Sequence, residues 1–595
     1  MLHKAAAETA VAPLTPTFQF PPRLRAFVRA RETSVTLIAA AMGVVAGLVV
    51  SAMSAAVSLM HALLFNIELG DRLSAEAVIE PIRALVPVFG GLLFGLSLML
   101  LARWRPGGEI DPIEANALHG GRMSFRGSVI VALQTIWSSG VGASVGLEAG
   151  YTQLSSGIAS WFGRKLNLRR NDQRLLVGCG AAAAIAGAFG APLAGAFYGF
   201  ELIIGGYTAA GLAPVGVASL NSYLIVRWLT PLQLGIITGS SGTITARDMV
   251  IASIFGVATA LFGICVMRGV ALWERFNTYI RLPLALRPAI GGIIVGGLAL
   301  LSPQVLSSGH GALHMTAYME MPLTLIGLIF VLKTIASIVS LGSGFRGGLF
   351  FASLLLGALG GRLFAAAVNG IIPGALLDPN IYAVLGMGAL SAAVIGGPLT
   401  MTFIVLESTG DLWLSTAVLI AVIIASQLTR ETFGYSFATW RFHLRGETIR
   451  SAADVGWIRD LSVGRMMRPD VSTVPQDTSV GDFRRLYPLG STSRVVAVDG
   501  KGGYAGIVEV PDVHGLEDSK IETIAEMLHH KDEVLVPNMN VKEAARTFDR
   551  AEAETLAVVD SLAEKRVLGT LTEAYTLRRY AEESERRRSE LLGEG

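Results

Sequence analysis

The chain contains the run Ser138-Ser139-Gly140-Val141-Gly142-Ala143-Ser144-Val145-Gly146-Leu147-Glu148-Ala149-Gly150, which glycines interrupt and which carries one carboxylate within an apolar region. A charged side chain at membrane depth costs about 2.5–3.5 kcal/mol on insertion scales, so Glu148 needs a specific reason to be there. The glycines break a helix, free backbone N–H groups and let a ligand approach the main chain. The run therefore predicts an anion site at a broken membrane helix, with an ionisable gate beside it.

The composition is typical of a membrane protein. Of the 595 residues, 52% are hydrophobic and 16% are charged, and the mean hydropathy is +0.54. Apolar stretches close to the roughly 18–20 residues that cross a bilayer recur from about residue 34 to 428. The net charge of +2 and the lack of a basic stripe with interleaved aromatic residues argue against nucleic acid as a partner. Cys179 and Cys265 lie in apolar segments and are expected to be reduced thiols.

Basic residues near the first span set the expected orientation. No cleavable signal peptide is visible, and the N-terminal segment, 1–33, ends with Arg23, Arg25, Arg29 and Arg31. By the positive-inside rule this segment is cytoplasmic, as is the basic loop at 164–170. We expect a multi-pass protein of a cell membrane, of the bacterial inner type.

The apolar segments are numerous and many are interrupted. Spans or broken spans are predicted at 34–65, 84–102, 127–157, 177–205, 211–228, 249–273, 288–301, 323–340, 347–368, 381–406 and 412–428. Short and glycine-broken membrane segments are typical of transporter-like bundles that fold back on themselves.

An internal repeat organises these segments. Pro192 is followed nine residues later by Glu201, and Pro398 is followed nine residues later by Glu407. A Gly/Ala-rich helix precedes each proline, so the sequence predicts two related halves at about 34–230 and 248–440. Matching broken segments in two halves predict a site at the interface between them.

Beyond a linker at 446–458 the chain becomes charged and alternates short strands with short helices. Strands are predicted at 495–498, 506–510, 533–536, 556–559 and 567–572. They fall into two similar soluble α/β units, 459–515 and 520–580, followed by a charged tail at 581–595. This region is predicted to be cytoplasmic.

Several of these motifs, in this order, resemble one family. They are Gly146–Gly150, the Gly190-Ala191-Pro192 motif before Glu201, Gly347-Gly348-Leu349-Phe350, the Gly397-Pro398-Leu399 motif before Glu407, and Tyr435. Over about 34–445 they resemble the CLC chloride channels and chloride/proton antiporters, and the C-terminal pair resembles a tandem CBS module. The resemblance implies an α-helical polytopic membrane protein: an inverted-repeat bundle with broken and re-entrant helices, a homodimer in the lipid membrane, and one anion pathway per subunit.

The same resemblance assigns roles to individual residues. Glu148 falls on the family's gating glutamate, whose carboxylate occupies an anion position until it is protonated or displaced. Leu349 and Phe350 match the pair whose backbone amides face the central anion, although Ala352 replaces the proline that follows in the family. Tyr435 matches the tyrosine whose hydroxyl contacts the inner anion.

Three departures from the family pattern affect these roles. Either Gly108 or Glu109 stands where the family has its central serine, and a glutamate there would disfavour anions unless it is neutral or turned away. Leu147 replaces an arginine. Leu202 stands where antiporters often carry an inner proton-relay glutamate, and a leucine cannot be titrated.

Glu201 or Glu109 could replace the missing relay. For Glu201 and Glu407, however, we favour a structural role, with each carboxylate paired with backbone or arginine at a helix end.

The CBS-like pair keeps half of a nucleotide-binding signature in each unit. The pattern T-x-x-D holds ribose and phosphate in such modules. Here Asp512 follows Glu509 at that spacing, and Thr572 precedes Tyr575. Two interpretations therefore stay open: an adenine nucleotide bound at Asp512 and Thr572, or a purely structural or dimer-forming pair.

The function expected from the sequence is a gated chloride channel that needs no cofactor. A chloride/proton antiporter using the same path is the first alternative, and a CBS-regulated divalent-cation transporter is the second. The acids Glu109, Asp111 and Glu114 are the only cluster suited to a cation, and they lie in a loop-like segment. No H-E-x-x-H helix or nucleophile–histidine arrangement points to an enzyme, and His61, His119, His310 and His314 are expected at the membrane interface.

Overall fold

The fold was analysed in a computed structural model of the chain, which describes residues 21, 32–104, 109–230, 244–318, 321–372, 374, 376–434, 436, 439, 461–515 and 521–592. Two compact units are present, Met1–Ala453 and Asp454–Gly595, and each is described by itself.

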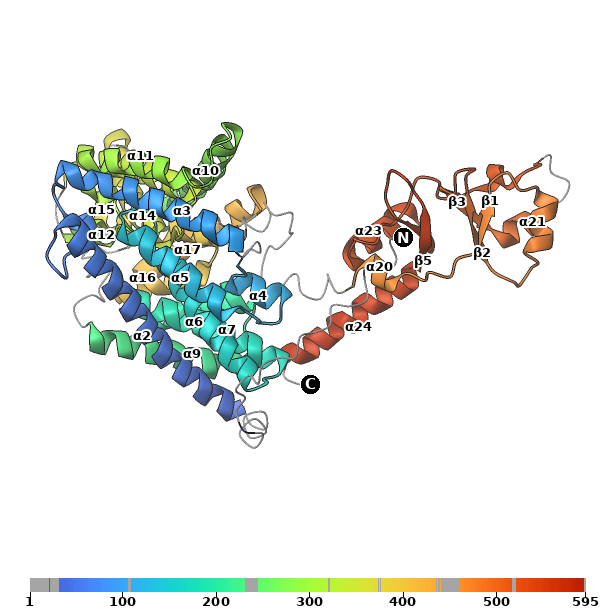
Figure 1. The fold of residues 1–595 in the computed structure, drawn as a ribbon, viewed down its shortest axis with the longest axis horizontal. Helices are drawn as coiled ribbons and strands as arrows, with labels where there is room; N and C mark the ends of the chain where they lie inside the picture. Colours follow the sequence, from blue (N-terminus) through green and yellow to red (C-terminus); the bar gives the residue numbers. More distant parts are fainter. Residues whose placement is uncertain are drawn as a thin grey trace. The chain divides into compact units, whose positions relative to one another are not determined.

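The first unit is a bundle of helices (Figure 1). Its first half contains α2 (Glu32–Phe65), η1 (Leu73–Ala75), η2 (Pro81–Leu85), α3 (Val86–Trp104), α4 (Pro112–Leu118), α5 (Phe125–Gly140), α6 (Glu148–Lys165), α7 (Arg170–Phe189), α8 (Pro192–Tyr198), the π-helix η3 (Gly199–Ile204) and α9 (Ala209–Leu229). Its second half contains α10 (Ala246–Tyr279), α11 (Arg287–Leu301), η4 (Pro303–Val305), α12 (His310–Tyr318), α13 (Leu323–Gly342), α14 (Phe350–Ile371), α15 (Pro379–Ile395), α16 (Pro398–Thr409) and α17 (Leu412–Thr432). Within the described residues, seven helices are long and apolar enough to cross a membrane.

The two halves match helix by helix. Helices α2 and α10, which begin them, are each 34 residues long. Helix α2 packs against α7 and α9, and α10 packs in the same way against α15 and α17. Two pairs of counterparts, α3 with α11 and α8 with α16, also touch each other across the halves. Contact between counterparts is what a pseudo-two-fold axis requires, so the predicted inverted-repeat bundle is confirmed.

Glycine and proline end and restart the helices at the same place in each half. Helix α7 ends at Gly190 (φ +65°) and α15 ends at Gly396 (φ +91°), both in the left-handed region that glycine adopts easily. Pro192 and Pro398 then begin α8 and α16. The single span predicted at 381–406 is therefore wrong, because Gly396 and Pro398 divide it into α15 and α16.

The second unit has the predicted α/β composition. Its elements are α20 (Val463–Met466), β1 (Thr473–Pro475), α21 (Val480–Leu486), β2 (Arg494–Val498), β3 (Tyr504–Glu509), α22 (Val510–His514), η5 (Ile524–Met527), α23 (Val541–Ala551), β4 (Thr555–Val559), β5 (Val567–Thr572) and α24 (Glu573–Leu592). One sheet has the order β1-β2-β3, with β1 parallel and β3 antiparallel to β2, and the other pairs β4 with β5.

The strand predicted at 533–536 is wrong, because this segment forms only an isolated parallel bridge between Leu535 and Val558. That bridge occupies the place that β1 takes beside β2 in the first half of the unit, where a short strand is present that the sequence pattern did not reveal. Both halves of the unit thus repeat one order, in which a helix separates a first edge segment from a two-stranded hairpin and a second helix follows.

Candidate functional site

Two broken segments, one from each repeat, meet in the interior of the first unit. Residues 141–147 join α5 to α6, and residues 343–349 join α13 to α14. Gly146 N donates to Gly348 O at 2.9 Å, and Gly348 N donates to Gly146 O at 3.2 Å, which forms an antiparallel bridge. The bridge brings the N-terminus of α6 next to the N-terminus of α14.

The two segments fold alike and hold each other. Gly142 and Gly344 occupy equivalent positions, with φ of +85° and +95°. Ser340 Oγ accepts from Ser144 N at 2.9 Å, and Ser138 Oγ accepts from Arg346 N at 3.0 Å. Each repeat therefore satisfies backbone groups of the other with a serine from the helix before its own break.

Helices α6 and α14 begin without polar caps. Their N-cap residues are Leu147 and Leu349, whose side chains offer no acceptor to the first backbone N–H groups. By contrast α4, α5, α9, α10, α15 and α17 begin at Asp111, Ser124, Thr208, Thr245, Asp378 and Asp411, whose side chains accept backbone N–H groups. Uncapped N–H groups and the positive end of the helix dipole make such a start suited to an anion.

The Glu148 carboxylate occupies this place. Glu148 is 5% exposed, and its carboxylate lies close to the backbone amide of Phe351, in the first turn of α14. Its Oε2 atom is buried and has no hydrogen-bond partner among the described residues. A Cβ atom added to Gly146 would lie 1.9 Å from Oε2, so only glycine leaves room for the carboxylate there.

Aromatic side chains enclose the same place. Phe350 is 3% exposed, and its ring centroid lies 4.5 Å from that of Phe189 and 6.2 Å from that of Tyr198. The Tyr198 hydroxyl lies near Thr152, and the charges of Asp111 and Glu148 act on it. Tyr198 was not a sequence prediction, because nothing in the run of α8 distinguishes it from a packing aromatic residue.

A cavity of about 500 Å³ extends from Glu148. Its lining comes from α2, from the segment after α2 and from both repeats, and includes Glu148, Tyr151, Ser139, Arg72, Ser307 and His310. Arg72 Nη1 donates to His310 O at 3.5 Å. A cationic side chain, Arg72, therefore lines the same cavity as Glu148.

A second cation, Lys333, lies fully buried beside the cavity. Its Nζ donates to Ser307 O at 2.8 Å and to Val305 O at 3.1 Å. Lys333 was not a sequence prediction, because its position near the cavity depends on the fold.

Two of the histidines expected at the membrane interface, His61 and His310, line the cavity. His61 is 7% exposed, and its Nε2 lies 3.0 Å from Ser139 O. The His310 ring stacks on Phe351, with 3.3 Å between centroids. Both histidines line the cavity, because the segments that carry them fold over the broken helices.

Glu201 and Glu407 act as caps across the repeats. Glu201 accepts from Leu399 N and Thr400 N, each at 2.9 Å, at the start of α16. Glu407 accepts from Leu193 N at 2.8 Å and Ala194 N at 2.9 Å, at the start of α8. Both carboxylates thus pair with backbone N–H groups at helix ends, which is the arrangement that a structural role requires. Leu202, beside Glu201 in η3, is 7% exposed.

Of the three acidic residues in the predicted cluster, Glu109 and Asp111 precede α4 and Glu114 lies in its first turn. Asp111 caps α4 by accepting from Glu114 N at 2.9 Å, and Glu114 Oε1 lies 3.9 Å from His119 Nε2. The Glu109 carboxylate lies against Gly127 in the first turn of α5. Among the described residues no three His, Cys, Asp or Glu side chains are grouped to hold a metal ion.

Some predicted positions lie outside the described residues, namely Gly108, Tyr435 and the N-terminal arginines at 23, 25, 29 and 31. In the second unit, Asp512 Oδ2 lies 3.5 Å from His529 Nε2, and Thr572 Oγ1 accepts from Tyr575 N at 3.4 Å. Both candidate nucleotide contacts thus have partners within the chain.

The match to a known protein family lies within the first unit. A model of the voltage-gated chloride channel family matches residues 90–430, more than half of the sequence. The chain belongs to the CLC family. A protein of Salmonella typhimurium named voltage-gated ClC-type chloride channel ClcB is 31% identical over 66% of this CLC chain and 95% of its own length. The protein of the same name from Escherichia coli O81 is 30% identical over the same shares.

Solved structures share the fold of this CLC chain. A slow cyanobacterial Cl⁻/H⁺ antiporter matches with a TM-score of 0.61 and 22% identity, over 69% of this chain and 98% of its own. A eukaryotic CLC transporter matches with a TM-score of 0.58 and 19% identity, over 93% of this chain and 98% of its own.

Proposed function

We propose that this CLC protein is a gated chloride channel in which Glu148 closes one anion pathway per subunit. The observation that carries the proposal is the meeting of two uncapped helix starts, α6 and α14, around a buried carboxylate with one unpartnered oxygen. The site needs no cofactor, because backbone groups and side chains of the chain supply every contact that the proposal uses.

The physical basis is competition between two anions. Backbone N–H groups at a helix start hold chloride without a full positive charge, so the ion can also leave. The Glu148 carboxylate is an anion tethered at the same place, close to the Phe351 amide. Protonation removes the negative charge of the carboxylate, so the carboxylate no longer competes for the Phe351 amide. The start of α14 is then available to chloride. Leu349 and Phe350 would then present their backbone amides to the ion.

Tyr198 supplies a hydroxyl in a pathway that lacks the family's serine. Its hydroxyl lies near Thr152 in the same enclosure as Phe350 and Glu148. Glu109, one candidate for the serine position, lies instead against the start of α5. We infer that Tyr198 contributes to the inner part of the anion site, together with Tyr435.

The residues at the expected inner proton-relay position, Leu202 and Glu201, favour a channel over an antiporter. Leu202 cannot carry a proton, and Glu201 already accepts three hydrogen bonds at the start of α16, two from backbone N–H groups and one from the Thr400 hydroxyl at 2.7 Å. Releasing Glu201 for proton transfer would leave those donors unsatisfied within the bundle. A chloride/proton antiporter using the same path is the alternative.

The deciding experiment records chloride and proton movement together in proteoliposomes that hold the full chain. We expect passive chloride flux that rises at acidic pH, without uphill proton movement. Glu148→Ala should conduct faster and lose the pH dependence, while the exposed control Glu68→Ala should match wild type. Uphill proton flux driven by a chloride gradient would establish the antiporter, and no flux of chloride, nitrate or fluoride would overturn the proposal.

For the second unit we propose a cytoplasmic CBS pair. Its two halves repeat one order of strands and helices, as expected for a tandem module. Asp512 and Thr572 are the positions at which an adenine nucleotide would be held. We also propose that the protein is a homodimer in the cell membrane, with the N-terminus on the cytoplasmic side.

A further inference from the structure

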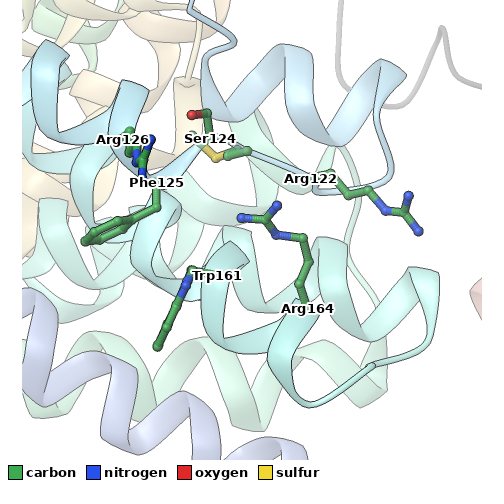
Figure 2. Close-up of a pocket in the computed structure, with 7 residues that line it drawn as sticks. Arg122, Ser124, Phe125, Arg126, Trp161 and Arg164 are labelled. Atoms are coloured by element: carbon green, nitrogen blue, oxygen red, sulfur yellow. The ribbon is translucent and has the colours of Figure 1, made fainter. Parts of the chain in front are cut away.

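A pocket lined by arginines lies where α5 begins and α6 ends. Its volume is about 450 Å³, and its lining includes Arg122, Ser124, Phe125, Arg126, Trp161 and Arg164. Figure 2 shows Arg164 reaching from the last turn of α6 towards the segment that carries Arg122 and Ser124. The pocket shares no lining residue with the cavity at Glu148.

The charges of this pocket call for an anion. Arg122 and Arg164 are close enough for their charges to act on each other. Arg126 is the second residue of α5, where the positive end of the helix dipole disfavours a cation. Arg122, Arg126 and Arg164 thus place three cationic side chains around the pocket, and a bound phosphate would meet positive charge from more than one side.

An apolar surface begins at the same pocket. Phe125 is 40% exposed, and its ring lies 6.2 Å from the half-buried ring of Trp161, over which Lys165 Nζ lies at 5.8 Å. Leu133 and Trp137, further along α5, are 59% and 36% exposed. Residues 125, 133 and 137 are separated by multiples of four, so they lie on one face of the helix. This face leads away from the arginines along the membrane-embedded helix.

The pocket lies at one membrane surface. Helix α6 ends in Arg164 and Lys165 and is followed by Arg169 and Arg170, a concentration of basic residues that marks the cytoplasmic side. The rings of Phe125 and Trp161 are suited to the boundary between headgroups and acyl chains. A ligand there meets positive charge on one side and apolar side chains on the other.

We propose that this pocket binds an anionic phospholipid of the cytoplasmic leaflet. The headgroup phosphate lies among Arg122, Arg126 and Arg164 at the start of α5, and an acyl chain follows Phe125, Leu133 and Trp137. The lipid joins α5 to α6 at the ends remote from the break at 141–147. This site does not depend on whether the protein is a channel or an antiporter.

The test uses the delipidated full chain in neutral detergent, with dioleoyl phosphatidylglycerol or dioleoyl phosphatidylcholine added. We expect phosphatidylglycerol to raise the unfolding midpoint by several degrees and phosphatidylcholine to leave it unchanged. Arg122→Gln/Arg126→Gln should lose most of that shift. The control Arg275→Gln/Arg430→Gln, which removes two exposed arginines from α10 and α17, should keep it.

A second measurement addresses the source of the phosphate. Native mass spectrometry should show fewer phosphatidylglycerol molecules retained by Arg122→Gln/Arg126→Gln than by the control. Leu133→Asn should also weaken retention, because it places an amide on the acyl-chain face. An equal shift with inorganic phosphate would assign the site to a soluble anion and overturn the lipid proposal. Equal retention by wild type and both double variants would overturn it as well.

Discussion

Glu148 differs from the other carboxylates at helix starts in what its oxygen atoms bind. Glu201 and Glu407 each receive two backbone N–H groups from the opposite repeat. Glu148 leaves Oε2 without a partner among the described residues. A carboxylate that is fully hydrogen-bonded at a helix start is costly to move, whereas one with an unused oxygen can exchange its place with chloride. The difference in hydrogen bonding therefore distinguishes the proposed gate, Glu148, from the caps.

Lys333 is the buried cation whose removal tests the electrostatics of the pathway. Its Nζ bonds two carbonyl oxygens beside the cavity, one of them from Ser307, which lines it. When it is protonated, this ammonium group in a low-dielectric interior attracts an anion in the adjoining cavity. We expect Lys333→Met to lower chloride flux several-fold in proteoliposomes.

Lys333→Arg keeps the charge and serves as the control, with the unfolding midpoint measured for both variants. If both variants fold and conduct like wild type, Lys333 is only a structural donor to the segment at 305–307.

The sequence was informative about residues wherever the signal was local. Glu148 could be predicted because a single carboxylate in an apolar, glycine-rich run has few explanations. Arg72, Tyr198 and Lys333 could not, because their importance depends on which segments fold against each other. A lone cation or tyrosine in a sequence says nothing about the cavity that it will line.

At the level of elements, a substitution in the break before α6 tests the proposed gate while Glu148 itself stays unchanged. A methyl group on Gly146 would lie 1.9 Å from Glu148 Oε2, so the carboxylate must leave its place at the start of α14. We expect Gly146→Ala to raise chloride flux towards that of Glu148→Ala, measured in the same vesicles.

The matched control is Gly297→Ala in α11, where the added methyl group meets no atom within 4 Å. It should conduct like wild type and gain up to about 1 kcal/mol of stability, because alanine favours a helix. A folded Gly146→Ala protein with wild-type flux would show that the carboxylate position does not set the gate.

The reciprocal caps join the two repeats through α8 and α16. Glu201→Gln and Glu407→Gln each replace a carboxylate that receives two backbone N–H groups, so each should cost about 1–2 kcal/mol of stability. We expect similar falls in the unfolding midpoint for both, and none for the exposed control Glu274→Gln on α10. Loss of proton movement in Glu201→Gln alone, with unchanged stability, would contradict the structural role.

Helix ends were predicted less well than the repeat that they belong to. The spacing from Pro192 to Glu201 and from Pro398 to Glu407 revealed two halves because it is a regularity along the chain. That each glutamate caps the other half's helix could not be derived, since the partners are about 200 residues apart. The wrong span at 381–406 has a local cause, because Gly396 and Pro398 were visible but were not used to end a helix.

At the level of the whole molecule, the pseudo-two-fold relation explains where the site lies. Helices α3 and α11 touch each other, as do α8 and α16, and the bridge between Gly146 and Gly348 joins the two broken segments. All three contacts pair equivalent parts of the repeats. A site built there receives one helix start from each half, although only one half supplies a carboxylate, since Phe350 stands where Glu148 stands in the other. The proposed pathway is therefore asymmetric, although the two repeats that surround it are related by a pseudo-two-fold axis.

The proposed pathway lies entirely within the first unit, which ends at Ala453. Every described residue that the proposed gate and its caps require precedes that boundary, so we expect the second unit to act on transport as a regulator. We expect a chain that ends at Ala453 to keep the chloride flux and the acid activation of the full protein. In the full chain AMP should raise the unfolding midpoint if the CBS pair binds a nucleotide, and Asp512→Ala/Thr572→Val should abolish that shift. A truncated chain that folds and enters vesicles but conducts no chloride would show that the second unit is part of the transport machinery, which would contradict the assignment of the pathway to the first unit alone.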